Sequence, residues 1–283
     1  MILIADSGST KTDWALVPSH LSPLTSHHSP LTTQGLNPYH LSPEAISGVL
    51  RGELLPQLPE GRVERVYFYG SGVTPGMQPR MASLLGEAFP SAATVEAQSD
   101  LLGAARALCG RSEGIACILG TGSNSCLFDG ERILQNTPAL GYILGDEGSG
   151  AVLGRRFLNA LYKGGLSEEI KRDFEATLGL TMAGVIERVY RQPLANRFLA
   201  SLSEFIHSRI GDDAVRELVV EAFEAFFTRN IVPYGRPDLP VSFVGSIAHY
   251  YEAELREAAR RRQFSIGTIL RSPLEALVAY HFG

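Results

Sequence analysis

One local pattern occurs twice in the chain and constrains the fold more than any other feature. An apolar run at residues 2–5 leads into a small polar loop and a second apolar run at 13–17. The same order of strand, loop and strand returns at residues 115–128. Each copy predicts two strands joined by a glycine-containing turn. The pairs Gly8-Ser9 and Gly122-Ser123 stand 114 residues apart, an interval that favours two domains of one design over a short solenoid repeat.

Strand and helix signals alternate through the first part of the chain. Residues 31–36, 63–69 and 93–97 have strand character, and residues 81–85 and 101–108 have helical spacing. Ser42-Pro43-Glu44 supplies an N-cap, a proline at the first helical position and an acid in the first turn, so a helix is predicted to begin there. This alternation is typical of α/β layered domains, and 283 residues are enough for two of them.

The second part of the chain has mostly helical patterns. A helical stretch follows Gly145-Asp146-Glu147-Gly148-Ser149-Gly150 and runs to Leu161, and most of residues 167–230 has helical character. A last strand is predicted at residues 241–244, and two amphipathic segments finish the chain. No structureless linker is visible between these parts.

Charge and composition exclude several classes of function. A net charge of −5 removes the electrostatic footprint of a general nucleic-acid binder. Arg260, Arg261 and Arg262 form the strongest basic run, and its place at the end of a helix-like stretch indicates a solvated helix end. No apolar run approaches the roughly 20 residues of a membrane span. We therefore expect neither a nucleic-acid nor a membrane partner.

The three cysteines indicate a reducing environment. Cys109, Cys117 and Cys126 form no C-x-x-C pair, and an odd number without a signal peptide argues against a disulfide framework. Cys117 and Cys126 lie in apolar, strand-like runs, where buried small side chains are expected. These features predict a cytoplasmic protein.

The two polar loops are candidate phosphate-binding elements. Tight turns after a strand present backbone N–H groups in one direction, and glycine removes the Cβ that would obstruct a ligand. The Asp6 carboxylate could hold Mg²⁺, and Lys11 could approach a phosphate as a point charge. Neither loop has the P-loop or the Rossmann fingerprint. For either loop alone, a plain hairpin turn is the better explanation, and only the pair favours a nucleotide.

Three acids have two interpretations each. Asp100 ends a short strand and opens a helix, so it is either an N-cap or a base that accepts the proton of a substrate hydroxyl during phosphoryl transfer. Asp146 and Glu147 also precede a helical segment, where capping and first-turn charge compete with substrate or metal binding. The residues alone leave these alternatives open.

Several short motifs, taken in order, resemble one family. They are Asp6-Ser7-Gly8-Ser9-Thr10-Lys11-Thr12, Gly35-Leu36-Asn37-Pro38, Ser99-Asp100, Gly120-Thr121-Gly122-Ser123-Asn124, Gly145-Asp146-Glu147-Gly148-Ser149-Gly150 and Val244-Gly245-Ser246. Together they resemble the N-acetylglucosamine kinase branch of the actin-like ATPase superfamily, which also includes activator ATPases of 2-hydroxyacyl-CoA dehydratases. The resemblance covers essentially the whole chain.

The resemblance implies an α/β fold with two ribonuclease-H-like domains around a central cleft. By the family's pattern, residues 1–111 and the final helix within 271–283 form the N-terminal domain. Residues 112–270 then form the C-terminal domain, which carries a helical insertion. A homodimer is also compatible with the resemblance.

The resemblance also implies roles for individual residues, with ATP and Mg²⁺ as cofactors. Asp6 corresponds to the magnesium-associated acid, and Asp100 to the base that activates the 6-hydroxyl of the sugar. The phosphate loops correspond to Gly8, Ser9, Thr10 and Lys11 and to Gly120, Thr121, Gly122 and Ser123. The sugar contacts correspond to Asn37, Ser71, Asn124 and Asp146, and Gly245 and Ser246 to the loop beside adenine or ribose.

The expected function is ATP-dependent phosphorylation of an amino sugar, N-acetylglucosamine above others, to its 6-phosphate. One alternative is an activator ATPase that works through a shared iron–sulfur cluster, for which the chain offers no recognisable pair of thiolates. Another is a non-catalytic sugar sensor. His20, His27 and His28 fall in a segment at 18–30 that is rich in serine and proline, and a solvated loop explains them better than a metal site does.

Overall fold

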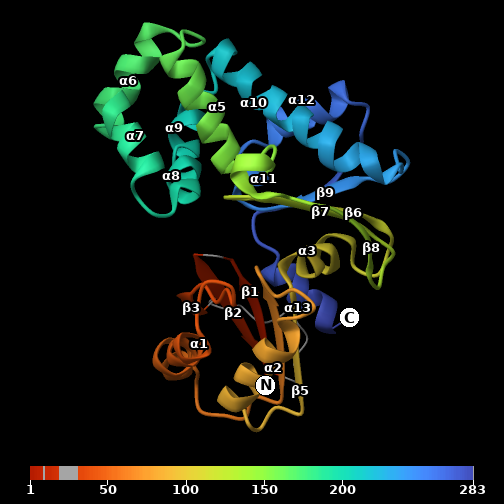
Figure 1. Ribbon diagram of the computed structural model, residues 1–283. Helices are drawn as coiled ribbons and strands as arrows, with labels where there is room; N and C mark the ends of the chain where they lie inside the picture. Colours follow the sequence, from red (N-terminus) through yellow and green to blue (C-terminus); the bar gives the residue numbers. More distant parts are fainter. Residues whose placement is uncertain (9, 19–30, 283) are drawn as a thin grey trace. The chain divides into compact units, whose positions relative to one another are not determined.

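The computed structural model describes residues 1–8, 10–18 and 31–282, and the chain forms two compact units (Figure 1). The first unit contains Met1–Ser112, Gly130–Arg132 and Ser272–Gly283. The second unit contains Glu113–Asp129 and Ile133–Arg271. Ser9 and the histidine-containing segment at 19–30 lie outside the described residues. The last helix therefore belongs to the same unit as the first strands.

The first unit is built on a five-stranded mixed sheet. Its strands are β1 (Ile2–Ser7), β2 (Lys11–Val17), β3 (Leu31–Gln34), β4 (Arg65–Gly70) and β5 (Thr94–Ser99). Their order is β3-β2-β1-β4-β5, with β2 antiparallel to both β1 and β3, and with β1, β4 and β5 parallel. The carboxyl ends of β1, β4 and β5 therefore meet at one edge of the sheet.

Helices cover both faces of this sheet, because its strands alternate two sets of apolar side chains. The helices are α1 (Pro43–Val49), η2 (Leu50–Leu54), η3 (Leu55–Gln57), α2 (Gln78–Ala88), α3 (Asp100–Cys109) and α13 (Leu274–Phe282). Leu3 and Trp14 are buried against α1 and α2, whereas Ile2 and Ile4 are buried against α13. Figure 1 shows α3 and α13 side by side on that second face. The expected helix start is confirmed, since the Ser42 side chain accepts the Ala45 N–H.

The second unit repeats the same sheet plan. Its strands are β6 (Gly114–Leu119), β7 (Ser123–Phe128), β8 (Ile133–Thr137), β9 (Val241–Val244) and β10 (Ile266–Leu270). Their order is β8-β7-β6-β9-β10, with the same sequence of antiparallel and parallel pairs as in the first unit. The recurrence in the sequence therefore corresponds to a duplicated topology, and the expected two-domain α/β fold is confirmed.

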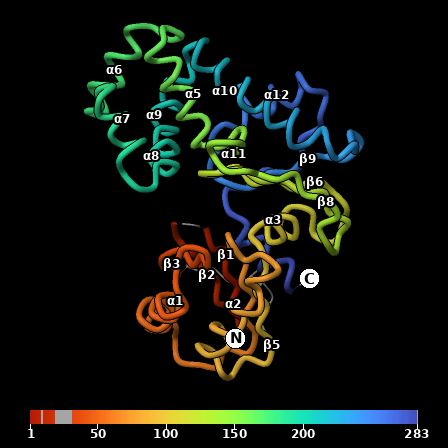
Figure 2. Tube along the Cα trace, viewed as in Figure 1, coloured from red at the N-terminus to blue at the C-terminus, as the bar shows by residue number. Residues whose placement is uncertain are grey.

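The second unit differs from the first by a long helical segment between β8 and β9. The helices of this segment are α4 (Gly141–Leu144), α5 (Gly150–Tyr162), α6 (Glu168–Leu178), α7 (Met182–Tyr190), α8 (Ala195–Ser201), α9 (Ser203–Ser208), α10 (Asp213–Phe226), η4 (Phe227–Ile231) and η5 (Val232–Tyr234). α11 (Ser246–Tyr250) and α12 (Glu252–Arg261) follow β9. Figure 2 shows α6 to α9 gathered beyond α5. Phe157, Phe174 and Phe205 form a buried aromatic cluster there, with ring centroids 5.4–5.8 Å apart.

Two strands of the second sheet depart from the sequence expectations. β8 was not expected, and β10 follows the segment at 241–244 that was predicted to be the last strand. Both lie at the edges of the sheet, and their residues are largely half-buried or exposed, so their apolar pattern is weak. The polar loops are also shorter than expected, because Lys11, Thr12, Ser123 and Asn124 pair as strand residues.

Candidate functional site

Two carboxylates lie at the carboxyl edge of the first sheet. Asp6 stands near the end of β1, directly opposite Asp13 of β2 and Tyr69 of β4. Burial, together with the charges of Asp100 and Asp13, raises the pKa of Asp6 to about 7, and the charge of Lys11 opposes this shift. Asp6 and Asp100 therefore interact electrostatically, although 94 residues of sequence separate them. Such a crowded pair of acids favours a bound cation or a shared proton.

Asp100 is the first residue of α3 and is not its N-cap. The cap is Ser99, whose Oγ accepts the Leu102 N–H at 3.2 Å. Asp100 Oδ1 accepts the N–H of Leu101 at 2.9 Å. Burial raises the pKa of Asp100, and backbone hydrogen bonds partly offset this effect. The capping interpretation of Asp100 is thus wrong.

The β1–β2 turn is closed by its own backbone. The Gly8 N–H donates to Lys11 O at 3.0 Å, so this amide is used within the turn, and Thr10 O accepts the Gly35 N–H at 3.1 Å. Lys11 extends from the turn with 64% of its side chain exposed, and its Nζ lies 2.6 Å from Asp13 Oδ2. Asp13 was not expected at this site. Asp13, which pairs with Asp6 in the register of β1 and β2, holds the Lys11 ammonium through this ion pair.

Ser7 joins three segments at this edge. Its Oγ lies 2.7 Å from Thr12 Oγ1 and accepts the Leu36 N–H at 3.0 Å, while its carbonyl oxygen accepts the Ser71 N–H at 2.8 Å. Ser7 and Thr12 are both buried. The structure therefore brings the segments of Asn37 and Ser71 next to the Asp6 strand. The family motif contains Ser7, but nothing in the sequence marked it as the connecting residue.

Asn37 is buried against a glycine that sequence reasoning also missed. Asn37 Oδ1 accepts the Tyr39 N–H at 2.9 Å. Gly72 has φ +80, and a Cβ at this position would lie 2.3 Å from Asn37 Oδ1. Only glycine fits both the left-handed backbone and this close approach. The glycines of Gly70-Ser71-Gly72 were a visible signal for such a turn.

The second polar loop is anchored to the start of α5. The Gly120 N–H donates to Gly122 O at 3.0 Å, and the Gly150 and Ala151 N–H groups donate to Gly120 O and Thr121 O at 2.9 and 3.2 Å. The first amides of α5 are thus used to hold the loop. Within the described part of the chain, the amides of Thr121 and Gly122 have no protein acceptor. They are the N–H groups of this loop that an anion could reach.

Asp146 is fixed against the same loop. It is buried, has φ +52, and its Oδ1 accepts the Ser123 N–H at 3.2 Å. A Cβ on Gly122 would lie 3.0 Å from Asp146 Oδ2, so the glycine leaves room for the carboxylate. Burial raises the pKa of Asp146, Glu147 raises it further, and the bond from Ser123 opposes both. Asp146 does not cap α5, because Ser149 does so by accepting the Val152 N–H.

Other residues expected near Asp146 have different contacts. Asn124 Oδ1 accepts Asn136 Nδ2 of β8 at 2.9 Å and the Ser125 N–H at 3.0 Å, so this side chain is directed along the sheet. Glu147 accepts hydrogen bonds from Arg229 at 3.1 Å and from Asn230 at 3.3 Å, and it does not cap α5, because Ser149 does. These bonds direct the side chains of Asn124 and Glu147 to groups other than the Asp146 carboxylate.

Gly245 lies beside the second loop, at the end of β9. It has φ +126, and a Cβ there would lie 2.2 Å from Leu119 O, the last residue of β6. Glycine therefore allows the chain to turn from β9 into α11 directly alongside the Gly120 turn. Ser246 is the first residue of α11. Gly120, Thr121, Gly122, Ser123, Asp146, Gly245 and Ser246 thus form one cluster in the second unit.

The cysteines do not form a thiolate site. Cys117 and Cys126 are buried in β6 and β7, and burial raises the pKa of the half-buried Cys109 to about 11. Among residues 1–8, 10–18 and 31–282, no group of three or more His, Cys, Asp and Glu side chains has the geometry of a metal cluster. Across the same residues, no helix has the length and apolar character needed to cross a membrane.

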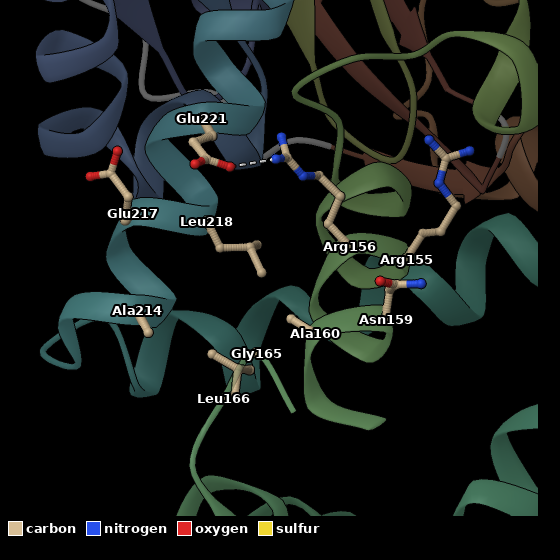
Figure 3. Close-up of a pocket in the computed structure, with 10 residues that line it drawn as sticks. All are labelled: Arg155, Arg156, Asn159, Ala160, Gly165, Leu166, Ala214, Glu217, Leu218 and Glu221. Atoms are coloured by element: carbon tan, nitrogen blue, oxygen red, sulfur yellow. Dashed lines mark hydrogen bonds and ion pairs between the residues drawn. The ribbon is translucent and has the colours of Figure 1, made fainter. Parts of the chain in front are cut away.

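The groove between α5 and α10 is separate from the expected site residues (Figure 3). It has a volume of about 570 Å³ and an apolar floor that includes Leu166 and Leu218. Arg156 and Glu221 form an ion pair across it at 2.7 Å. Arg155 donates to the carbonyl oxygens of Tyr142 and Ile143.

Comparison with known proteins finds structures similar to the whole chain. A Porphyromonas gingivalis protein with the provisional name N-acetylglucosamine kinase has 47% identity and a TM-score of 0.95, and the match covers 100% of this chain and 99% of that one. A Chromobacterium violaceum protein with the same provisional name has 20% identity and a TM-score of 0.72, covering 99% and 98%. A glucokinase of the ROK family from Streptomyces griseus, in complex with glucose and AMPPNP, has 15% identity and a TM-score of 0.56, covering 99% and 97%.

The last two similarities concern the fold alone. No protein-family model matches the chain, and no curated protein matches it significantly.

Proposed function

The chain belongs to the N-acetylglucosamine kinase branch of the actin-like ATPase superfamily. We propose that it transfers a phosphoryl group from ATP to the 6-hydroxyl of an amino sugar, with N-acetylglucosamine as the preferred substrate. The observation that carries this proposal is the pair of acids at one sheet edge. Asp6 and Asp100 interact electrostatically next to the β1–β2 turn. The chain has 47% sequence identity to the protein with the provisional name N-acetylglucosamine kinase.

Asp100 is the proposed base. Its carboxylate is held at the start of α3 by the Leu101 N–H and has a raised pKa, which makes it a better proton acceptor than an ordinary aspartate. It would accept the proton of the 6-hydroxyl as the oxygen attacks phosphorus. Phosphoryl transfer depends mainly on positioning and charge stabilisation, so a rigidly held carboxylate is well suited to this step.

The residues around Asp6 fit a magnesium ion. Mg²⁺ is usually held by one or two carboxylates together with waters and substrate phosphates. The charge of the Asp6 carboxylate is disfavoured by burial and by its neighbours Asp100 and Asp13, which a cation would offset. Bound there, the ion would neutralise charge on the phosphates of ATP. Lys11 would contribute a further positive charge next to the turn, where Asp13 orients it.

The remaining residues are proposed to bind the two substrates. Backbone amides of Thr10, Thr121 and Gly122 would donate to phosphate oxygens, along with hydroxyls of the two turns. Of the expected sugar contacts, Asn37 and Ser71 belong to segments held next to the end of β1, and Asp146 lies against the Gly120 turn of the second unit. Asn124 is engaged with Asn136. Gly245 and Ser246 would leave room for adenine or ribose beside the Gly120 turn.

Replacement of Asp100 tests the proposal. Asp100→Asn keeps the size of the side chain and removes its basicity, so kcat for sugar phosphorylation is expected to fall about 10²–10⁴-fold while the Kd of ATP changes little. Asp213→Asn is the matched control, because Asp213 is likewise the first residue of a helix whose N-cap is the residue before it. Near-normal turnover by Asp100→Asn would remove Asp100 from the role of base.

A further inference from the structure

A partly buried polar cluster connects α3 to the first sheet, on the strands next to the two acids. It consists of Tyr69 on β4, Glu96 on β5, Arg106 on α3 and His281 on α13. Arg106 Nη1 donates to the Tyr69 hydroxyl at 2.7 Å and to Glu96 Oε1 at 2.9 Å. The Tyr69 hydroxyl lies 2.8 Å from His281 Nε2. One hydroxyl thus connects the helix that carries Asp100 to the last helix of the chain.

The Tyr69 hydroxyl is the central group of this cluster. Arginine can only donate, so the Tyr69 oxygen accepts from Arg106. The hydroxyl also shares a hydrogen bond with His281 Nε2, and the direction of that bond depends on the tautomer of the imidazole. Its ring is stacked on Tyr67, with centroids 3.7 Å apart and planes at 19°. The Tyr69 hydroxyl is thus hydrogen-bonded to α3 and to α13 at once, which favours a rigid connection.

The same tyrosine sets the distance between α3 and the sheet. Tyr69 is 1% exposed, and a Cβ on Gly103 of α3 would lie 2.8 Å from Tyr69 Cβ. Gly103 lies one helical turn after Asp100, and Tyr69 stands beside Asp6 in the register of β4 and β1. The contact between Tyr69 and Gly103, which positions α3, therefore lies beside Asp6 in the sheet and one helical turn from Asp100.

We infer that Tyr69, Arg106 and His281 are positioning residues, which hold α3 so that the Asp100 carboxylate keeps its place relative to Asp6. This inference rests on the proposed function, since it gives Asp100 a catalytic task. None of the three side chains needs to touch a substrate. A displacement of about 1 Å at a reacting group can lower a rate about 10²-fold, so small movements of α3 have large consequences.

The test compares two variants with a control of similar structural cost. Arg106→Met keeps the length of the side chain and removes its donors, and Tyr69→Phe keeps the ring against Gly103 and removes the hydroxyl. Leu54→Ala is the control, because Leu54 is fully buried on the opposite face of the same sheet. At a temperature where all variants are folded, kcat is expected to fall roughly tenfold to 100-fold for Arg106→Met and about threefold to tenfold for Tyr69→Phe. KM for ATP should change less than about threefold, and Leu54→Ala should keep its kcat within about twofold.

A double-mutant cycle separates positioning from general destabilisation. If Arg106 acts through Asp100, then Arg106→Met should change kcat less than about twofold in the Asp100→Asn background. Full additivity of the two substitutions would overturn the inference, and so would a kcat loss no larger than that of Leu54→Ala.

Hydrogen exchange gives a readout that does not depend on activity. The amides of residues 101–104 should exchange at least about tenfold faster in Arg106→Met, with no comparable change in α2. Unchanged exchange in α3 would overturn the inference even for an active kinase. Faster exchange in a protein that phosphorylates no sugar would instead contradict the proposed function and the catalytic consequence drawn here.

Discussion

Asp6 has no acidic counterpart in the second unit. In the first hairpin Ser7 pairs with Thr12, and in the second Leu119 pairs with Ser123 at the corresponding end. Ile118 therefore occupies the position equivalent to Asp6. The two hairpins have the same strand pairing but carry different functional groups. The first has acids at its strand ends, and the second has a glycine turn in which the Thr121 and Gly122 amides have no acceptor among the described residues.

Gly72 gives a residue-scale prediction about Asn37. A Cβ at Gly72 would lie 2.3 Å from Asn37 Oδ1, and the backbone has φ +80, so Gly72→Ala should lower the free energy of unfolding by about 1–3 kcal/mol. The displaced Asn37 should also raise KM for the sugar more than KM for ATP. Urea unfolding and steady-state kinetics measure both effects.

Gly76→Ala is the control for this substitution, because a Cβ at Gly76 meets nothing within 4 Å. An unchanged stability of Gly72→Ala would show that the turn can relax. An unchanged KM for the sugar would remove Asn37 from the sugar contacts.

Individual site residues could be predicted only where short motifs marked them. Asp6, Asp100 and Asp146 stand beside glycine or at strand ends in the sequence, so they were identified. The tasks of Ser7 and Asp13 depend on strands that pair far along the chain, and no local pattern reports them. The capping error at Asp100 arose because serine and aspartate are adjacent and both are good caps.

At the scale of elements, central strands were predictable and edge strands were less so. β1, β4 and β6 are buried and nearly continuously apolar, as central parallel strands should be. β8 and β10 have one neighbour each and little burial, so their sequences carry a weak period of two. Helices were found more reliably because their amphipathic pattern extends over many residues.

The contact of α13 with β4 predicts a pH effect on stability. Burial, with the charge of Arg106, lowers the pKa of His281 to about 4 in the folded protein, below the ordinary 6.5 of the unfolded chain. Between these values the unfolded chain binds a proton that the folded protein does not. The free energy of unfolding therefore falls as the pH decreases from about 6.5 to 4, by up to about 3 kcal/mol from this group.

His281→Phe should make this pH dependence shallower in denaturant titrations at several pH values between 4 and 7. His249→Phe, at an exposed position of α11, serves as the control and should leave it unchanged. An identical pH dependence for His281→Phe and the unsubstituted protein would mean that His281 is not the group responsible.

At the scale of the whole molecule, the chain contains one sheet plan twice with unequal additions. The first unit has α1, η2 and η3 between its third and fourth strands, whereas the second has the segment from α4 to η5 in the same place. The sequence revealed this duplication because the hairpin motif survives in both copies. The length of the helical segment was visible as well, but the packing of its helices around Phe157 and Phe174 was not.

The central claim is that this chain is an amino-sugar kinase, and a phosphorylation assay over a small sugar panel tests it most directly. Purified protein with ATP and Mg²⁺ is given N-acetylglucosamine, glucosamine, N-acetylmuramic acid or glucose, and the products are identified by mass spectrometry and ³¹P NMR. We expect N-acetylglucosamine 6-phosphate to form with the highest kcat/KM of the panel and its formation to stop when the metal is chelated. Folded protein that phosphorylates no sugar of the panel, or that hydrolyses ATP at a rate independent of sugar, would contradict the account.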